Sequence, residues 1–320
     1  MCLECGCGRP DPARIDGEPA DSIHSPLVDA LPVSSETGRG HSHGHSHPHA
    51  DHDHHHDHDH DHHHDAIPGH EHPPEPRGDH PETSTHRVVE VHQALLARND
   101  LQAERNRGFF RALGVLTINV VSAPGSGKTE LLRRTITTLG TRLRVGVIVG
   151  DVATDNDARW LRDTGAAVVQ ITTGTLCHLD AGMVARAVGR LDARNLDLLF
   201  LENVGNLVCP AAFDLGEDLR VVLLSVTEGE DKPLKYPPLF HSAHAAVVTK
   251  TDLSEAAGFD RETALRNLRR VSHHAEVFEL SARSGQGMED WCRFLEDKHR
   301  QAAGSPPGAA PVPLPAIASS

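Results

Sequence analysis

The segment "SAPGSGKTELL", from Ser122 to Leu132, has the residue types and spacing of a phosphate-binding loop. Its two glycines let consecutive backbone N–H groups point at one phosphate group, while Lys128 can reach the β- and γ-phosphates and Thr129 can ligate Mg²⁺. A chance glycine-rich turn is the alternative, although an apolar run precedes the segment and a helical pattern follows it. Ser122 departs from the motif, which usually has Gly there. The residues that we expect to bind nucleotide here are Pro124, Gly125, Ser126, Gly127, Lys128 and Thr129.

A second pattern concerns the nucleotide base. In "VVTKTDL", Lys250 and Asp252 have the spacing of the guanine-reading element N-K-x-D, and Thr249 replaces the Asn that normally braces this loop. An Asp carboxylate accepts hydrogen bonds from guanine N1–H and N2–H₂, a pairing that adenine cannot supply. In "LSARSG", Ser281 and Ala282 match the short S-A-x element whose backbone N–H meets guanine O6. Each pattern alone is weak, but together, downstream of a phosphate-binding loop, they predict GTP rather than ATP.

Acidic residues follow two further apolar runs. Asp151 ends one run, in "GDVATDND", and "ENVGNLV" contains Glu202 and Gly205 in the spacing of the D-x-x-G switch, with Glu for Asp. Such an acid holds Mg²⁺ or its water shell, and the glycine N–H can sense the γ-phosphate. Ordinary acidic loop residues are the alternative, most of all for Asp155 and Asp157. The expected catalytic set is Lys128, Thr129, Asp151, Glu202 and Gly205, with Mg²⁺ on Thr129 and Asp151.

Two cysteines and a histidine lie near this switch segment in the expected fold. Cys177 and His178 are adjacent at the expected start of a helix, where the helix dipole favours a thiolate. Cys209 follows Gly205 by four residues. Two thiolates and an imidazole suit Ni²⁺ or Zn²⁺ and are one ligand short of a tetrahedral set, which water or a second subunit could complete. A buried structural cysteine is the alternative, and it applies to Cys292.

The amino-terminal part carries two more groups of metal ligands. Three clustered thiolates can enclose Ni²⁺ in a square plane, with a disulfide or a zinc knuckle as the alternative. These cysteines are Cys2, Cys5 and Cys7. Residues 41–64 hold fourteen histidines, and imidazoles interleaved with carboxylates favour metal binding over a plain linker or an expression tag. The histidines are His41, His43, His45, His47, His49, His52, His54, His55, His56, His58, His60, His62, His63 and His64.

Short apolar runs alternate with helical patterns between residues 85 and 300, and these elements must position the groups above. Near-continuous apolar strands separated by helices indicate a mostly parallel sheet covered by helices on both faces. The expected fold is therefore a three-layer α/β P-loop NTPase. Before the first strand, an amphipathic helix should dock on the domain edge through Val88, Val91, Leu95 and Leu96. The expected strands are Val115–Val121, Arg144–Val149, Ala167–Ile171, Asp197–Asn203, Arg220–Val226, Ala245–Lys250 and Ala275–Leu280.

Composition divides the chain into four parts. A cysteine cluster at 1–8 precedes a Pro-, Gly-, His- and Asp-rich region at 9–84, which we expect to be disordered without metal. A folded domain follows at 85–300, and a disordered Pro/Ala tail at 301–320. A formal net charge of −14 argues against binding to nucleic-acid backbones or anionic membranes. With no apolar run long enough to span a bilayer and no charged-then-apolar leader, we expect a cytoplasmic protein.

In combination, the motifs resemble those of the HypB family, nickel-binding GTPases that serve the maturation of nickel–iron hydrogenase. The resemblance rests on "MCLECGC", the His-rich tract, "SAPGSGKT", "GDVATDND", "TLCHLD", "ENVGNLVCP", "EGEDKPLKYP" and "VVTKTDL". It implies a fold shared with the urease GTPase UreG, a tight nickel site on the amino-terminal cysteines, and a weaker site on Cys177, His178 and Cys209. It also implies a homodimer promoted by GTP or metal. The implied partners are a HypA-type nickel protein, a SlyD-type chaperone and the hydrogenase large-subunit precursor.

The expected function is that of a nickel metallochaperone, in which GTP hydrolysis switches the metal-loaded protein between holding and releasing nickel for a hydrogenase. One alternative is a nickel or zinc storage buffer with a vestigial phosphate loop, which the intact Lys128, Thr129 and Asp252 disfavour. The other alternative is a GTPase that matures urease or another metalloenzyme. The expected cofactors are GTP, Mg²⁺, Ni²⁺ and Zn²⁺.

Overall fold

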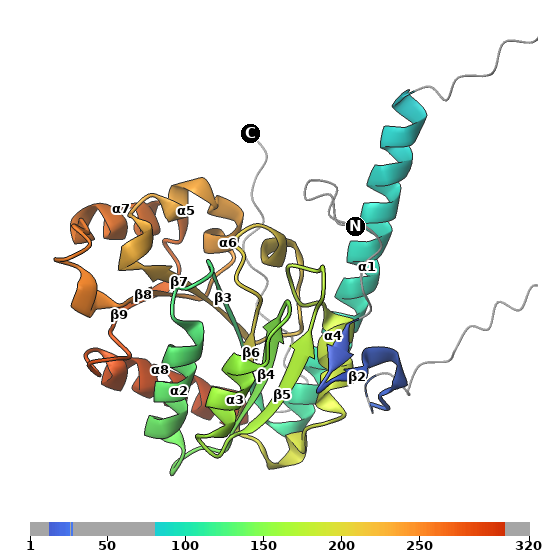
Figure 1. Ribbon diagram of the computed structural model, residues 1–320, viewed down its shortest axis with the longest axis horizontal. Helices are drawn as coiled ribbons and strands as arrows, with labels where there is room; N and C mark the ends of the chain where they lie inside the picture. Colours follow the sequence, from blue (N-terminus) through green and yellow to red (C-terminus); the bar gives the residue numbers. More distant parts are fainter. Residues whose placement is uncertain (1–12, 26, 28–80, 305–320) are drawn as a thin grey trace, which may run out of the picture. The chain divides into compact units, whose positions relative to one another are not determined.

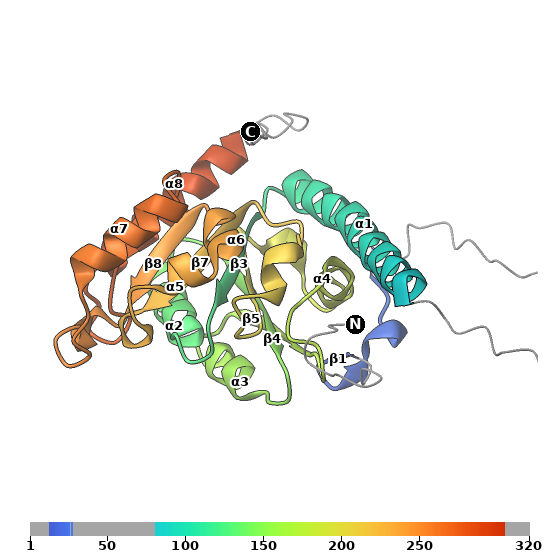
Figure 2. The same ribbon diagram turned by 90° about the horizontal axis from the view of Figure 1, so that it is seen from above.

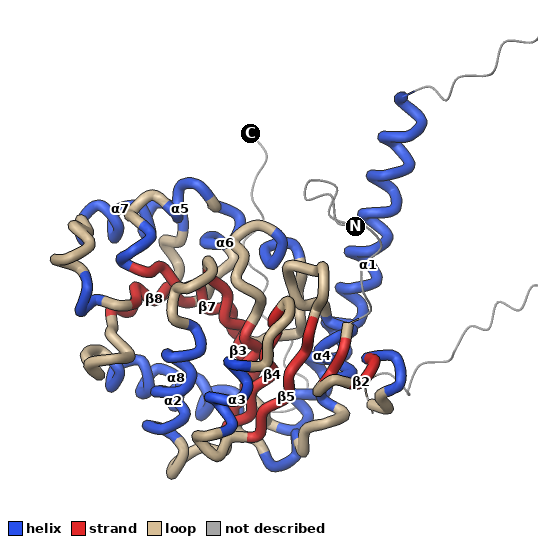
Figure 3. Tube along the Cα trace, in the orientation of Figure 1, coloured by secondary structure: helices blue, strands red, loops and turns tan. Residues whose placement is uncertain are grey.

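The computed structural model describes residues 13–25, 27 and 81–304 (Figure 1). The chain divides into two units, residues 1–31 with 89–320 and residues 32–88, and the described part of the second unit is the start of helix α1 (Pro81–Leu113). The first unit contains one nine-stranded sheet with helices on both sides (Figure 3). The predicted three-layer α/β fold is therefore confirmed. Among the described helices, none is both long and apolar enough to cross a membrane.

The strands of the sheet agree with the seven expected apolar runs to within two residues at each end, and two short strands precede them. They are β1 (Arg14–Ile15), β2 (Glu18–Pro19), β3 (Leu116–Ser122), β4 (Val145–Asp151), β5 (Ala167–Thr172), β6 (Leu198–Glu202), β7 (Leu219–Ser225), β8 (Ala245–Thr249) and β9 (Glu276–Glu279). Their order in the sheet is β2-β1-β5-β4-β6-β3-β7-β8-β9. The seven strands from β3 to β9 pair in parallel, whereas β1 pairs antiparallel with both β2 and β5. The functional motifs on the parallel strands should therefore meet at one edge.

Helices cover both faces because side chains alternate along each strand. In β6, Leu198 and Phe200 pack with α2, α3 and α8, whereas Leu199 and Leu201 pack with α1 and α4. Over β7 and β8, the second face is covered by α6 and α7. The bounds of these helices are α2 (Lys128–Leu139), α3 (Asn156–Arg162), α4 (Ala181–Val188), α5 (Lys232–Lys235), α6 (Pro237–His241), α7 (Arg261–Val271) and α8 (Met288–Gly304). The 3₁₀ turns between them include η1 (Ala20–Ser22), η3 (Cys209–Ala212), η4 (Val226–Glu228) and η5 (Thr251–Leu253).

Helix α1 lies beside α4 (Figures 1 and 2) and agrees with the predicted stripe only in part. Leu96 is half-buried, Leu95 is 46% exposed, and the side chains of Val88 and Val91 lie outside the described residues. The buried positions are Asn99, Ala103, Asn106 and Phe110. The side-chain amides of Asn99 and Asn106 form hydrogen bonds with backbone groups of α4 and of residues 214–215, at 2.8–2.9 Å. Polar side chains thus help to set the buried face of this helix, and the prediction from apolar residues alone was wrong for Leu95.

An amino-terminal hairpin departs from the prediction that residues 9–84 are disordered. Asp16 and Gly17 have φ values of 46° and 85°, as a two-residue type I′ turn requires, and Asp-Gly is a favoured sequence for this turn. Ile15 is fully buried in the core shared by β5 and α4, and Ser25 Oγ donates to a backbone carbonyl of α4. Residues 14–19 therefore extend the sheet, and residues 20–25 pack beside it. The described helices also extend beyond the expected domain bounds of 85–300, because α1 begins at 81 and α8 ends at 304. The rest of the regions that we expected to be disordered lies outside the described residues.

Replacing Phe110 by Ala should lower the free energy of unfolding by about 3–5 kcal/mol, because the ring is fully buried and its loss leaves a cavity under α1. Denaturant unfolding followed by far-UV circular dichroism measures this change. Leu101→Ala on the same helix is the matched control, since Leu101 is 65% exposed and its loss should cost less than about 0.5 kcal/mol. Equal effects of the two substitutions would contradict the docking of α1 through its Phe110 face.

Candidate nucleotide and metal site

The phosphate-binding loop connects the carboxyl end of β3 to the start of α2. Gly125 and Gly127 have φ values of 73° and 92°, a left-handed conformation that glycine adopts without strain. Lys128 begins the helix and is buried, and its Nζ donates to Ser122 Oγ at 3.1 Å. Burial lowers the pKa of Lys128, and the carboxylate of Glu202 opposes this shift. The serine that departs from the usual motif thus holds the loop lysine in place.

The magnesium-binding groups expected on α2 and β6 are in contact. Thr129 Oγ1 donates to Glu202 Oε1 at 2.8 Å, and Glu202 Oε2 is buried without a hydrogen-bond partner. Burial raises the pKa of Glu202 to about 7, although the charge of Lys128 opposes the rise. A hydroxyl and a buried carboxylate with an unpaired oxygen are hard donors of the kind that Mg²⁺ prefers. These residues therefore fit a bound Mg²⁺.

The acids of the loop between β4 and α3 do not all face this centre. One carboxylate oxygen of Asp151 accepts from two backbone N–H groups of its own loop, at 2.9 and 2.7 Å. Asp155 is exposed and forms an ion pair along α3. Asp157 is half-buried, and its charge acts on the pKa of both Lys128 and Glu202, as does that of Asp151. Asp151 and Asp157 thus lie near the phosphate-binding groups, and Asp155 does not.

The expected switch glycine touches the phosphate-binding loop. Gly205 follows β6, and a Cβ built on it would lie 2.9 Å from Pro124 Cα, closer than a side chain tolerates. The same segment continues to Cys209, the first residue of η3. A close approach of two backbones therefore requires glycine here, and it joins the phosphate-binding loop to the segment that carries the candidate metal ligand Cys209.

The base-reading loop after β8 is braced against the phosphate-binding loop. Thr249 Oγ1 donates to Ser126 O at 2.8 Å, which supplies the bracing expected of Asn in the usual motif. Lys250 has a φ of 59°, and its Nζ donates to Gly125 O at 2.6 Å. Asp252 is exposed in η5, where its carboxylate is accessible to a base. The replacement of Asn by Thr therefore leaves the connection between the two loops intact.

The second guanine element lies beside this loop. Thr251 N–H donates to Leu280 O at 3.3 Å, which joins the segments that follow β8 and β9. Ser281 N–H donates to Gln286 O at 3.0 Å and is used within its own loop. Of the two expected residues, Ser281 thus has its N–H engaged within the protein.

The expected thiolate and imidazole ligands come together from two loops. Cys177 Sγ and Cys209 Sγ are 3.0 Å apart, and one ring nitrogen of His178 lies within 4.8 Å of both. The His178 ring stacks on Phe213 with centroids 3.9 Å apart, and its Nδ1 is buried without a hydrogen-bond partner. Burial lowers the pKa of His178, which favours the neutral imidazole that binds metals. The three residues therefore offer a compact set of soft and borderline ligands.

One detail predicted for this group of ligands is wrong. Helix α4 begins at Ala181 with Asp180 as its N-cap, so Cys177 lies in the preceding loop and not at the helix start. A helix dipole fades within the first turn, so the position opposite Cys209, and not the dipole, prepares this cysteine for metal. Sequence reasoning also missed Asn206, whose Nδ2 donates to Cys177 O at 3.4 Å. An asparagine that orients a loop carries no ligand signature in the sequence.

Cys292 has the structural role expected of it. The thiol is buried beside Trp291, and burial raises its pKa to about 11, so it stays protonated. The amino-terminal cysteines and the histidines of 41–64 lie outside the described residues, and their metal-binding roles stay predictions.

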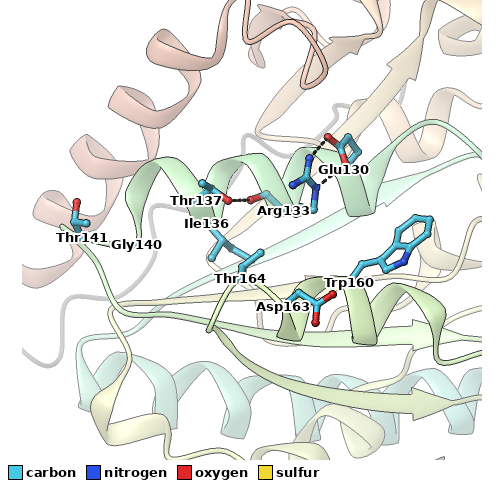
Figure 4. Close-up of a pocket in the computed structure, with 9 residues that line it drawn as sticks. All are labelled: Glu130, Arg133, Ile136, Thr137, Gly140, Thr141, Trp160, Asp163 and Thr164. Atoms are coloured by element: carbon cyan, nitrogen blue, oxygen red, sulfur yellow. Dashed lines mark hydrogen bonds and ion pairs between the residues drawn. The ribbon is translucent and has the colours of Figure 1, made fainter.

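A groove between α2 and α3 lies outside this centre. Figure 4 shows it, with the exposed Trp160 on one side and the ion pair of Glu130 and Arg133 on the other. Its described lining includes no residue that we expect to bind nucleotide or metal. The lining of the groove therefore includes neither the phosphate-binding loop nor the three candidate metal ligands.

Comparisons with known sequences agree with this arrangement. Residues 116–279 match the family described as "CobW/HypB/UreG, nucleotide-binding domain". The hydrogenase maturation factor HypB of Azotobacter vinelandii is 53% identical over 220 residues, which cover 69% of this chain and 73% of the relative. HypB of Escherichia coli is 48% identical over 216 residues, covering 68% of this chain and 74% of the relative. The hydrogenase/urease maturation factor HypB of Helicobacter hepaticus is 39% identical over 217 residues, which cover 67% of this chain and 89% of the relative.

Solved structures have the same fold. The crystal structure of the hydrogenase maturation factor HypB from Archaeoglobus fulgidus matches with a TM-score of 0.60 and 40% identity, covering 63% of this chain and 99% of that one. The crystal structure of HypB from Helicobacter pylori in complex with nickel matches with a TM-score of 0.62 and 36% identity, covering 65% of this chain and 98% of that one. The nucleotide-binding fold is thus a family feature.

Replacing Thr249 by Val should weaken nucleotide binding, because the phosphate-binding loop loses its hydrogen bond at Ser126 O. The expected loss is about 1 kcal/mol, or about a fivefold rise in the Kd for GTP. Isothermal titration calorimetry measures this change. Thr249→Ser keeps the hydroxyl and should bind GTP like the parent chain. Equal affinities of the Val and Ser variants would show that the hydrogen bond contributes nothing to nucleotide binding.

The metal-free protein should lose stability as the pH rises through 7, in part because of Glu202. Its pKa is about 7 in the folded state and near 4.5 in the unfolded state, so the folded state binds the extra proton between these values. The stabilisation is present below pH 4.5 and is lost as the pH rises through 7. Between pH 6 and pH 8, the parent chain should lose about 1 kcal/mol more unfolding free energy than Glu202→Gln, measured with a chelator present. An identical pH dependence of the two chains would place the pKa of Glu202 in its ordinary range.

Proposed function

We propose that this chain, which belongs to the HypB family of hydrogenase maturation factors, is a GTPase that binds nickel and delivers it to the large-subunit precursor of a hydrogenase. GTP hydrolysis switches the metal-loaded protein between holding and releasing nickel. The observation that carries the proposal is the short path between the phosphate-binding loop and the three metal ligands. Gly205 touches Pro124 of that loop, and Cys209 lies four residues further along the same segment.

The proposed hydrolysis uses the groups around the start of α2. Loop N–H groups and Lys128 hold the β- and γ-phosphates, and the lysine charge counters the charge that develops during transfer. Thr129 and Glu202 hold Mg²⁺. Asp151, which the sequence predicted as a magnesium ligand, accepts backbone hydrogen bonds within its own loop and adds negative charge nearby together with Asp157. When bound, the ion supplies electrostatic stabilisation of the transferring phosphoryl group.

The proposed preference for guanine rests on the two loops after β8 and β9. The Lys250 stem covers the base plane, and the exposed carboxylate of Asp252 accepts from guanine N1–H and N2–H₂. The N–H of Ala282 donates to guanine O6. Adenine has an acceptor at N1, no amino group at C2 and an amino donor at C6. The same loops would therefore leave the Asp252 carboxylate without a hydrogen-bond donor when ATP is bound.

The proposed nickel site consists of Cys177, His178 and Cys209, with the remaining ligand from water or from a second copy of the chain. The related HypB of Helicobacter pylori was solved in complex with nickel, which supports this metal, and Zn²⁺ suits the same ligands. Completion of the ligand shell by a second copy would make metal and GTP promote a homodimer.

The same proposal gives the amino-terminal region two roles in nickel handling. The cysteines of 1–8 form a tight site, and the histidines of 41–64 form a reservoir of weak chelates in which neighbouring imidazoles raise the effective concentration of ligand. A HypA-type nickel protein and a SlyD-type chaperone are the proposed partners alongside the hydrogenase precursor. We propose that this nickel delivery takes place in the cytoplasm.

A second candidate function concerns the target enzyme. The Helicobacter hepaticus relative is named as a hydrogenase/urease maturation factor, so delivery to urease is the alternative that an observation favours. A storage buffer with a vestigial phosphate loop is disfavoured, because Thr249 and Lys250 still brace that loop. Competition between the two apo-enzymes for nickel from the loaded chain would separate the targets.

Lys128→Ala should reduce GTP hydrolysis by about 100-fold or more, because the γ-phosphate loses the charge that balances it in the transition state. Phosphate release under single-turnover conditions measures this loss. Lys235→Ala is the matched control, since Lys235 is exposed on α5 and pairs with Asp231 there. Equal turnover of the two variants would remove the GTPase from the proposed function.

Nickel affinity at the proposed Cys177, His178 and Cys209 site should differ between GDP and a non-hydrolysable GTP analogue by about 5–150-fold, a coupling of about 1–3 kcal/mol. Equilibrium titration tests this in a chain with the amino-terminal cysteines replaced by Ala and residues 41–64 deleted. Nickel must change nucleotide affinity by the same factor.

Gly205→Ala should shrink this difference, because its Cβ would press on Pro124 and displace the connecting segment. Gly108→Ala is the matched control, since a Cβ there meets no atom within 4 Å. Equal nickel affinity in the two nucleotide states of the parent chain would show that the site is structural and not switched.

A further inference from the structure

The chain between β6 and β7, which carries Cys209, is packed against the domain but has little regular structure. Its one described regular element is the four-residue turn η3. On either side of Cys209, Leu207 and Leu215 are buried in the apolar cores under α6 and α4. A packed segment without a strand or a long helix needs other partners for its backbone carbonyls. The groups that supply these partners therefore help to fix the position of Cys209.

The guanidinium of Arg220, on β7, supplies two of these partners. It donates to Phe213 O at 2.9 Å, directly after η3, and to Ala211 O at 3.5 Å, inside η3. The Phe213 ring stacks on His178 with centroids 3.9 Å apart. Because Arg220 is only 7% exposed, water competes little for these hydrogen bonds. One buried side chain thus holds both the turn that begins with Cys209 and the residue whose ring supports His178.

A buried carboxylate and the pairing of two central strands set the position of Arg220. Arg220 Nε donates to Glu217 Oε1 at 2.9 Å, and Asn119 Nδ2 donates to the same oxygen at 3.1 Å. Asn119 and Arg220 are opposite each other in the parallel pairing of β3 and β7, and Glu217 is also only 7% exposed. A buried ion pair adds little net stability, because desolvation offsets the attraction between its charges. Stability alone therefore does not account for a charged pair at this depth of the sheet.

Asn203 connects this network to the loop that follows β5. Its Nδ2 donates to Asn119 Oδ1 at 3.3 Å, and its Oδ1 accepts from Leu179 N–H at 3.1 Å. Asn203 is fully buried and directly follows β6, while Leu179 directly follows His178. The hydrogen bonds therefore run without a break from the loop after β5 to the turn η3, the two segments that carry the candidate metal ligands.

We propose that Arg220 is a positioning residue for the candidate metal site, and that its network sets the separation of Cys177 and Cys209, whose Sγ atoms lie 3.0 Å apart. The network holds the Cys209 segment at both ends, through Asn203 before it and through Phe213 after it. The stretch between these two ends is then the part that nucleotide can move. The inference rests on the proposed function for the identity of the metal, whereas the spacing of the two thiols can be measured without a metal.

The shape of the guanidinium suggests the substitution that separates its geometry from its charge. Its planar fork donates in several directions at once, to the Glu217 carboxylate, to the two carbonyls around η3 and to Ser242 Oγ. Lysine keeps the positive charge beside Glu217 but has a single nitrogen, so it cannot replace this fork. Arg220→Lys should therefore keep the ion pair and release η3.

An arsenical that bridges two thiols tests the spacing without metal. Phenylarsine oxide forms two arsenic–sulfur bonds with neighbouring thiols and releases water, so its affinity reports how closely Cys177 and Cys209 are held. The full-length chain is used with the cysteines of 1–8 replaced by Ser. Arg220→Lys should raise the Kd for the arsenical by about tenfold, the lower end of what outer groups contribute at metal sites. Competition with a small dithiol, followed by intact-mass spectrometry, measures this change.

Two control variants separate positioning from general stability. Arg144→Lys alters the same kind of side chain at the amino end of β4, where it binds Asp197, and should leave the Kd unchanged. Leu295→Ala removes a fully buried side chain of α8 and should lower stability without changing the Kd. An unchanged Kd in Arg220→Lys, or an equal rise in Leu295→Ala, would overturn the positioning. If Arg220→Lys does not fold, Glu217→Gln decides, with a rise of about threefold supporting the positioning and an unchanged Kd overturning it.

Nickel binding tests the consequence in the same chains. A chelator buffer sets the free Ni²⁺ concentration, so the histidines of 41–64 do not alter it, and thiolate-to-nickel absorption reports occupancy of the site. The Kd for Ni²⁺ should rise about 10–100-fold in Arg220→Lys, while the Kd for GTP stays that of the parent chain. An equal Kd for Ni²⁺ in the two chains would overturn the positioning alone. A parent chain that shows no nickel absorption, but whose arsenical affinity depends on Arg220, would contradict the proposed function and support the positioning.

Discussion

The chemistry of this protein depends on the common direction of its parallel strands. Strands β3, β4, β6 and β8 end at one edge of the sheet, and each is followed by a loop with a different task. The expected tasks are phosphate binding, a carboxylate near the phosphates, a carboxylate with a switch glycine, and base reading. These motifs are separated by up to about 130 residues, yet they converge because the carboxyl ends of parallel strands share an edge. Reversal of any one strand would carry its motif to the opposite edge.

Both functional centres contain buried polar atoms without partners, which an ordinary core avoids. Glu202 Oε2 and His178 Nδ1 are buried and have no hydrogen-bond partner. Burial raises the pKa of Glu202 and lowers the pKa of His178, and both shifts favour the neutral form of the side chain. Such groups lower the stability of the protein by itself, and cations or metals that bind them restore it. The arrangement therefore favours a ligand-loaded state at each centre. The nearby Lys128 reduces this cost for Glu202 without forming a hydrogen bond to it, since its Nζ bonds to Ser122 instead.

Patterns that are local in the sequence predicted much of this molecule. Apolar runs gave the parallel strands, and motif spacing gave the residues at their ends, because strands and loops are encoded by neighbouring residues. Some of the errors concern contacts between distant segments. The buried face of α1 depends on hydrogen bonds between the side-chain amides of Asn99 and Asn106 and segments at least 75 residues away. The periodicity of apolar residues does not indicate such hydrogen bonds. The hairpin was missed although its Asp16-Gly17 turn is a local signal, because the surrounding composition indicated disorder.

The proposed metal ligands span three strands of the sheet, and this position explains how nucleotide could act on them. Cys177 follows β5 and Cys209 follows β6, while β4 lies between these strands and ends in Asp151. The strands themselves are held by continuous pairing and a packed core, so a change at the γ-phosphate cannot move them apart. The segment from Gly205 to Cys209 has no such pairing in its described contacts and touches the phosphate-binding loop at Pro124. In the proposed switch, nucleotide would therefore change the separation of the two thiolates through this segment, whose Asn206 Nδ2 also donates to Cys177 O at 3.4 Å, while the sheet stays rigid.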